Sequence, residues 1–287
     1  MTNLMKCLLV AILIVLSSVS SVRSAEKYIL FILDTSGSMY EFKYNMSKTA
    51  IIKAMKSRPT DVEVALRVFN QDSFKTRETG CNNSELILDF DDYDVDTLSK
   101  TLKSVKVFGQ TPLAQTMLEC EYDFFDKDKI NEIVLITDGA DTCDGDPCDI
   151  AKRLNKSFGI IINVIAIDMN PQDRDKISCI SENAGGKLIH IGDLRQFENA
   201  LIEFYELPQS PLIVVITDSD GEKISGDIKI YDKYGDIVLE SIEPLREFSP
   251  SLPIGEYSVC AWYDGERICV RNINVRDKQP ANIVITF

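Results

Sequence analysis

The segment Tyr28-Ile-Leu-Phe-Ile-Leu-Asp-Thr-Ser-Gly-Ser-Met39 joins a strand pattern to a row of oxygen-bearing side chains. Its continuous apolar run, Tyr28–Leu33, predicts a strand that is covered on both faces. Asp34, Ser36 and Ser38 follow directly, so a carboxylate and two hydroxyls share one strand end. A helix pattern comes next, in which apolar residues recur every four positions: Phe42, Met46, Ala50 and Ala54.

Strand and helix patterns alternate from Tyr28 to about Leu207. Further apolar runs predict strands at residues 62–69, 86–90, 133–137, 160–167 and 187–191. Helical periods predict helices at residues 95–105, 112–125, 150–154, 173–183 and 194–207, and Gly185-Gly186 is expected to close the helix at 173–183. This alternation predicts an α/β domain over residues 25–207, with a doubly wound, mainly parallel sheet between two layers of helices.

The pattern changes after Pro208–Pro211, which we interpret as a linker. Residues 211–287 contain six short strand-like runs, at 213–217, 228–231, 237–242, 257–263, 268–275 and 282–287. Turn sequences such as Asp-Gly separate them, and no helical period is visible. Short strands with regular turns predict a small all-β sandwich as a second domain.

Residues 1–24 have the pattern of a signal peptide. Lys6 provides a positive charge, Cys7–Leu16 is apolar, and Val22 and Ser24 occupy the −3 and −1 positions for cleavage before Ala25. We therefore expect an exported protein, which is secreted, periplasmic or on the cell surface. The apolar run is shorter than the roughly 20 residues that span a bilayer, so contact with a membrane is expected only through an uncleaved N-terminal anchor.

Charge and histidine content narrow the function. The 45 acidic residues outnumber the 31 basic ones and give a net charge of −14. Nucleic acid is therefore not an expected partner, because binding it requires a basic surface. The one histidine, His190, lies in the predicted strand 187–191, and a chain with a single histidine has little means for acid–base catalysis. We expect no enzymatic activity.

Cysteines of exported proteins usually form disulfides. The turn Asp264-Gly265 predicts a hairpin in which Cys260 lies opposite Cys269, in a non-hydrogen-bonded pair whose Cα atoms are about 4.5 Å apart. We therefore predict that these two are bonded. Cys120 is predicted to be a buried thiol, because it shares one helical stripe with Leu113, Met117 and Phe124.

Four further cysteines are expected to form two disulfides, but their spacing does not give the connectivity. They are Cys81, Cys143, Cys148 and Cys179. Zinc binding by Cys143 and Cys148 is a weaker alternative in an oxidising compartment.

Two later strand ends also carry oxygen side chains, Thr111 before a predicted helix and Asp138 after the predicted strand 133–137. Each alone could be only a helix cap or a turn residue. Ligands of open α/β sheets bind at the carboxyl edge where strand order reverses. If Tyr28–Leu33 and Ile133–Thr137 are neighbours there, Asp34 and Asp138 meet. A site with oxygen ligands only suits a small hard cation such as Mg²⁺, with Mn²⁺ or Ca²⁺ as alternatives.

Together these residues resemble the metal-ion-dependent adhesion site of von Willebrand factor type A domains, whose motif is Asp-x-Ser-x-Ser, then a Thr, then an Asp. The matching positions are Asp34, Ser36, Ser38, Thr111 and Asp138. Residues 33–39 and 109–113 are similar to bacterial-type members, and residues 142–148 with Cys179 to a cysteine-bearing subgroup. The resemblance covers about residues 27–207. Residues 211–287 resemble, more weakly, sandwich domains related to carboxypeptidase regulatory regions or transthyretin.

The resemblance implies that the serine hydroxyls hold a divalent cation directly, that Thr111 is a ligand in one state, and that both aspartates act largely through water. An open coordination position would accept an Asp or Glu of a partner protein. Because the site has few anionic ligands, the charge of Mg²⁺ is not fully neutralised, and this favours such a partner carboxylate. A nearby acidic loop could repel it or bind a second cation, but we interpret it as solvated charge: Asp141, Asp144 and Asp146.

We therefore predict an adhesion-type module that binds a protein partner through its metal. A hydrolase is one alternative, because phosphatases of the haloacid dehalogenase type also begin with a strand that ends in Asp. They need a second carboxylate two residues later, where this chain has Ser36. The other alternative is a structural scaffold whose site is unused.

Overall fold

The computed structural model describes residues 26–69, 80–82, 84–90, 94–127, 129–276 and 279–287. The predicted signal peptide, residues 1–24, lies outside these residues. The chain divides into two compact units, one up to Leu201 and one from Ile202 onward. None of the helices in the described ranges is long and apolar enough to cross a membrane.

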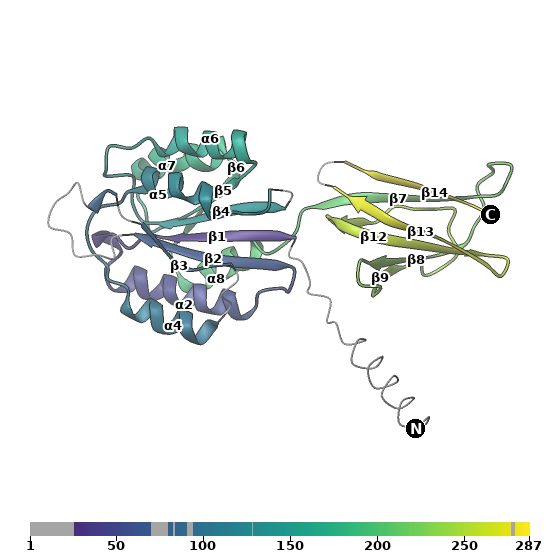
Figure 1. The fold of residues 1–287 in the computed structure, drawn as a ribbon, viewed down its shortest axis with the longest axis horizontal. Coiled ribbons are helices and arrows are strands. Elements are labelled where there is room, and N and C mark those ends of the chain that lie inside the picture. Colours follow the sequence, from purple (N-terminus) through teal and green to yellow (C-terminus); the bar gives the residue numbers. More distant parts are fainter. Residues whose placement is uncertain (1–25, 70–79, 83, 91–93, 128, 277–278) are drawn as a thin grey trace, which may run out of the picture. The chain divides into compact units, whose positions relative to one another are not determined.

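A six-stranded sheet forms the centre of the first unit, in the order β3-β2-β1-β4-β5-β6 (Figure 1). Its strands are β1 (Lys27–Leu33), β2 (Val62–Phe69), β3 (Ser84–Leu88), β4 (Ile130–Thr137), β5 (Ile161–Ile167) and β6 (Gly185–Ile191). The β2–β3 pair is antiparallel and the other pairs are parallel. All seven residues of β1 are buried, as the apolar run predicts for a central strand.

Helices cover both faces of this sheet. They are α2 (Phe42–Lys56), α4 (Val95–Ser104), α5 (Leu113–Glu119), α6 (Pro147–Phe158), α7 (Pro171–Asn183) and α8 (Leu194–Glu203), with short 3-10 helices η1 (Gly37–Met39) and η2 (Cys120–Tyr122). Figure 1 shows α5, α6 and α7 on one face and α2, α4 and α8 on the other. The predicted α/β fold with a mainly parallel sheet is confirmed.

The strand order reverses at β1. From β1 the chain first continues to β2 on one side, and it later returns to place β4 on the other side. In the β1–β4 pair, Leu33 lies opposite Ile136, so the two strands end together at their carboxyl edge. The predicted neighbourhood of these two strands is confirmed, and this edge is where an open α/β sheet binds ligands.

Several predicted boundaries are wrong, among them those of two helices. The helix expected at residues 112–125 ends at Glu119, and η2 follows it. The short helix expected at 150–154 extends over Pro147–Phe158, because Asp146 caps its first turn. Gly185 ends the preceding helix as predicted, because it follows the C-cap residue Ala184 with φ +69°, the left-handed conformation that glycine favours at a helix end, and it also begins β6. A Cβ at Gly186 would lie 2.0 Å from the carbonyl oxygen of Ile162, so this glycine permits close pairing with β5.

The second unit is a β-sandwich. Its strands are β7 (Gln209–Thr217), β8 (Asp227–Asp232), β9 (Ile237–Glu240), β10 (Glu247–Phe248), β11 (Ser251–Pro253), β12 (Gly255–Tyr263), β13 (Glu266–Val275) and β14 (Ala281–Thr286). One sheet has the order β10-β7-β11, with β14 parallel to β7, and the other has the order β13-β12-β8-β9. Buried apolar residues of both sheets share one core, among them Val214, Ile230 and Val259.

The predicted linker is largely strand. β7 begins at Gln209, and Ser210 and Pro211 pair with Leu252 and Ser251 of β11. Pro211 lacks a backbone N–H and therefore favoured the prediction of a linker, but it lies near the beginning of β7, before the pairing with β14 starts at Leu212.

Three disulfides join the described cysteines. Cys260 is bonded to Cys269 across the β12–β13 hairpin, at a Cα distance of 4.0 Å, which confirms the predicted pair. The two pairs that spacing left open are Cys81–Cys143 and Cys148–Cys179. The zinc alternative for Cys143 and Cys148 is therefore wrong. Such bonds are typical of extracellular or periplasmic proteins.

Cys120 is the free cysteine of the described residues, and it is buried as predicted. Burial raises the pKa of its thiol well above the usual value, because the apolar surroundings disfavour the thiolate. A thiol of this kind is a packing residue and not a nucleophile.

Candidate metal centre

Asp34 is the fully buried residue that follows β1. Its Oδ1 accepts a hydrogen bond from the backbone N–H of Ser36 at 2.7 Å, and its Oδ2 accepts one from the Thr137 hydroxyl at 2.6 Å. Its own backbone N–H donates to the carbonyl of Ile136, which extends the β1–β4 pairing to the site. The carboxylate is therefore fixed from both strands.

Ser38 connects Ser36 to the second aspartate of the motif. The hydroxyl oxygens of Ser36 and Ser38 lie 3.1 Å apart. The Ser38 hydroxyl donates to Oδ1 of Asp138 at 2.7 Å. Four of the five predicted ligands, Asp34, Ser36, Ser38 and Asp138, are thus linked by hydrogen bonds at the carboxyl ends of β1 and β4.

Thr111 lies in the neighbouring loop before α5 and is buried. The N–H of Gly37 donates to the carbonyl of Gly109, and the N–H of Phe108 donates to the carbonyl of Thr35, so this loop is attached to the Asp34–Ser38 loop. The backbone N–H of Thr111 donates to the Thr142 hydroxyl at 2.8 Å, and its carbonyl accepts from the Thr142 N–H. These bonds fix the backbone of Thr111 in a loop that is attached to the Asp34–Ser38 loop.

The electrostatics of Asp34 favour a cation. Burial raises its pKa from the ordinary 3.8 to about 6, because the buried charge has lost its hydration. Hydrogen bonds from Ser36 and Thr137 lower the pKa again in part, and the Asp138 carboxylate raises it further. A cation next to Asp34 would offset this cost of burial.

Sequence reasoning missed two residues of the site. One is Thr137, whose hydroxyl donates to Asp34 and whose position before Asp138 is the only sequence signal. The other is Lys43, in the first turn of α2, whose Nζ donates to Oδ2 of Asp138 at 2.6 Å. The Asp138 side chain is fully buried, and 24% of the Lys43 side chain is exposed. Nothing in the sequence pattern distinguishes this lysine from other surface lysines.

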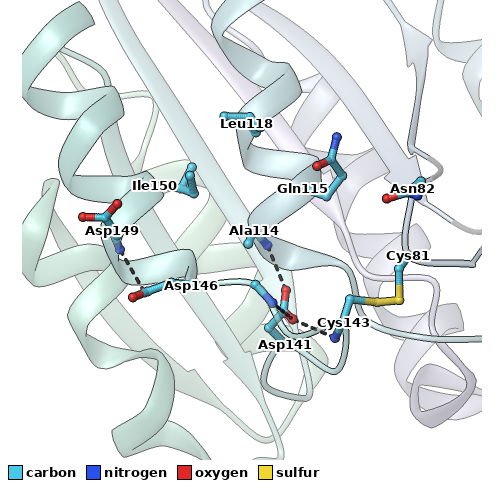
Figure 2. Close-up of a pocket in the computed structure, with 11 residues that line it drawn as sticks. Cys81, Asn82, Ala114, Gln115, Leu118, Asp141, Cys143, Asp146, Asp149 and Ile150 are labelled. Atoms are coloured by element: carbon cyan, nitrogen blue, oxygen red, sulfur yellow. Dashed lines mark hydrogen bonds between the residues drawn. A yellow bond between two sulfur atoms is a disulfide. The ribbon is translucent and has the colours of Figure 1, made fainter. Parts of the chain in front are cut away.

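A pocket of about 280 Å³ lies between α5, α6 and the Cys81–Cys143 disulfide (Figure 2). The carboxylate of Asp141 enters it and accepts hydrogen bonds from the N–H groups of Ala114, Cys143 and Gly145. Asp141 therefore shapes this loop and is not a solvated charge.

Asp146 also binds backbone groups. Its carboxylate accepts from the N–H groups of Cys148 and Asp149, both at 3.0 Å, and so caps α6. The acidic loop is used largely for structure, which leaves the oxygen cluster at Asp34 and Asp138 as the better candidate for a cation.

The donor set fits a hard cation. The ranges that the structure describes contain no group of three or more His, Cys, Asp or Glu side chains placed to hold a metal. The candidate set is of another kind, with two carboxylates and three hydroxyls, and oxygen donors are those that Mg²⁺ prefers. His190 is exposed on β6, an edge strand that lies three positions from β1 in the sheet.

The von Willebrand factor type A domain model matches residues 29–202, which is more than half of the chain, so the chain belongs to this family. It is similar to two proteins of Bacillus subtilis (strain 168) that are named as uncharacterized. YwmD is 28% identical over 194 residues, which cover 64% of this chain and 87% of YwmD. YwmC is 30% identical over 168 residues, which cover 54% of this chain and 73% of YwmC.

Among solved structures, the pilus adhesin SpaC from Lactobacillus rhamnosus GG aligns with a TM-score of 0.51 and 9% identity. The alignment covers 84% of this chain and 54% of SpaC. At this identity the likeness concerns the fold alone. The family is one in which binding, often of proteins, is the common role.

Proposed function

We propose that the first unit is a metal-dependent protein-binding module. Asp34, Ser36, Ser38, Thr111 and Asp138 would hold a divalent cation, Mg²⁺ in the first place. The cation would keep one coordination position for the carboxylate of an Asp or Glu on a partner protein. The observation that carries this proposal is the hydrogen-bonded chain from Asp34 to Asp138 at the point where the strand order reverses.

The surface next to the serines supports contact with a protein. Tyr40 and Phe42 follow Ser38 closely and are 66% and 69% exposed. Exposed aromatic side chains are enriched in protein interfaces, where they bury a large area. A partner that brings its carboxylate to the cation would cover these two rings.

The positions of the carboxylates and of the histidine favour a binding role over catalysis. Position 36 holds a serine, so Asp34 lacks the second carboxylate of the phosphatase mechanism. His190 lies on an edge strand away from the oxygen cluster. We infer that the cation holds a ligand and does not activate water for hydrolysis.

The metal titration tests the proposal. Mg²⁺ or Mn²⁺, titrated by calorimetry into the protein with its disulfides intact, should bind saturably at one site. The variant Asp34→Ala/Thr111→Ala should lose this binding while its circular dichroism spectrum stays that of a folded protein. Binding that persists in the variant would contradict the proposed ligands. No binding in the wild type would favour the scaffold alternative.

We further propose that the protein is exported and that its signal peptide is removed before Ala25. The mature chain would then contain one free thiol, Cys120, whereas a chain that keeps residues 1–24 would also contain Cys7. In denaturant without reductant, a thiol reagent should therefore label one cysteine per chain, and the intact mass should correspond to a start at Ala25. Two labelled thiols would show an uncleaved N-terminal segment.

A further inference from the structure

Lys43 is the charged residue of the site that no motif contains. Its ammonium group lies 2.6 Å from Oδ2 of Asp138, while Oδ1 of the same carboxylate accepts from Ser38 at 2.7 Å. The Asp138 carboxylate thus accepts a hydrogen bond from Ser38 with one oxygen and from Lys43 with the other. The Asp138 side chain is fully buried, whereas 24% of the Lys43 side chain is exposed.

We propose that Lys43 sets the charge of the metal-loaded site so that it requires one partner carboxylate. This inference rests on the proposed function. Asp34 and Asp138 contribute two negative charges, Lys43 contributes one positive charge, and a divalent cation adds two. The loaded site then has one surplus positive charge, which a single Asp or Glu of the partner neutralises. Without Lys43 the loaded site is already neutral and gains less from a partner carboxylate.

The same lysine should weaken binding of the metal alone. Two cations that share one carboxylate repel each other, and a partly buried position screens this repulsion less than bulk water does. We expect removal of the Lys43 charge to tighten Mg²⁺ binding by about tenfold. If Lys43 served only to position Asp138 as a ligand, its removal would weaken Mg²⁺ binding. The sign of the change therefore separates the two roles.

Two substitutions isolate the charge. Lys43→Gln removes the charge and keeps an N–H donor for Asp138, whereas Lys43→Arg keeps the charge. Lys48→Gln is the matched control on the same helix, because Lys48 donates to Asn45 and not to a residue of the site. Lys43→Met serves as a second charge-free variant, and circular dichroism checks that each protein is folded.

The experiment is a calorimetric titration of Mg²⁺ into the full protein, in sodium chloride and in sodium acetate of equal ionic strength. Lys43→Gln should bind Mg²⁺ about tenfold more tightly than the wild type in chloride, and Lys43→Arg and Lys48→Gln should bind like the wild type. Acetate, as the probe for a partner carboxylate, should strengthen Mg²⁺ binding more in the wild type than in Lys43→Gln.

Unchanged or weaker Mg²⁺ binding in both charge-free variants would overturn this inference and leave the proposed metal site standing. An equal effect of acetate in the wild type and Lys43→Gln would overturn the link to the partner carboxylate. Absence of saturable binding in every variant would overturn the proposed function itself, and the role of Lys43 with it.

Discussion

In metal-free protein at pH 7, Asp34→Asn should raise the free energy of unfolding by about 3 kcal/mol. The pKa of Asp34 is raised from 3.8 to about 6 by burial, so the folded state binds a proton more tightly than the unfolded state does. The stabilisation by this proton is complete below about pH 4 and is lost as the pH rises through about 6. Asparagine resembles the protonated acid and avoids that loss.

Urea denaturation in EDTA at pH 4 and pH 7 measures this effect. The difference between Asp34→Asn and the wild type should be small at pH 4 and large at pH 7. Saturating Mg²⁺ should reduce or reverse it at pH 7, because a ligand that binds only the folded wild type stabilises that protein alone.

Asp138→Asn is the control for this experiment and should act in the opposite direction. It removes the partner of Lys43 in an ion pair whose carboxylate is fully buried, so it should destabilise the metal-free protein. A metal-free Asp34→Asn variant that is less stable than the wild type at pH 7 would contradict the prediction for Asp34.

The sheet was predictable from sequence because central parallel strands are buried on both faces and are therefore unbroken apolar runs. Such runs are Tyr28–Leu33 in β1, Ile133–Ile136 in β4 and Val164–Ile167 in β5. Gly185-Gly186 was predictable in part: Gly185 ends α7 as expected, but the close pairing of Gly186 with β5 was not expected. The need for glycine at position 186 comes from the nearby carbonyl of Ile162, and that contact belongs to the tertiary structure.

The residues of the site that belong to the sequence motif were predictable. Asp34, Ser36 and Ser38 share one segment, and Asp138 joins them once β1 and β4 are neighbours. The contact of Lys43 with Asp138 was not predictable, because it depends on the direction of α2 relative to the preceding loop. Glu41 has φ +56° directly before this helix, and neither that turn nor its direction is encoded in a recognisable pattern.

The Cys81–Cys143 disulfide should stabilise both the fold and the metal site. It closes a loop with a sequence separation of 62 residues, for which chain entropy predicts a contribution of about 4 kcal/mol. Cys143 follows Thr142, whose hydroxyl and N–H hold both backbone groups of Thr111. Cys81→Ser/Cys143→Ser should therefore lower the free energy of unfolding by about 4 kcal/mol and weaken Mg²⁺ binding by about tenfold, as expected when a residue that orients a ligand is loosened.

Cys148→Ser/Cys179→Ser is the matched control, because that bond joins α6 to α7 and closes a loop with a separation of 31 residues. Its removal should cost a similar free energy of unfolding and leave Mg²⁺ affinity near that of the wild type. Urea denaturation and Mg²⁺ calorimetry on both double variants measure the two effects separately. Equal Mg²⁺ affinity in the two variants would show that the Cys81–Cys143 bond stabilises the chain without holding Thr111 in place.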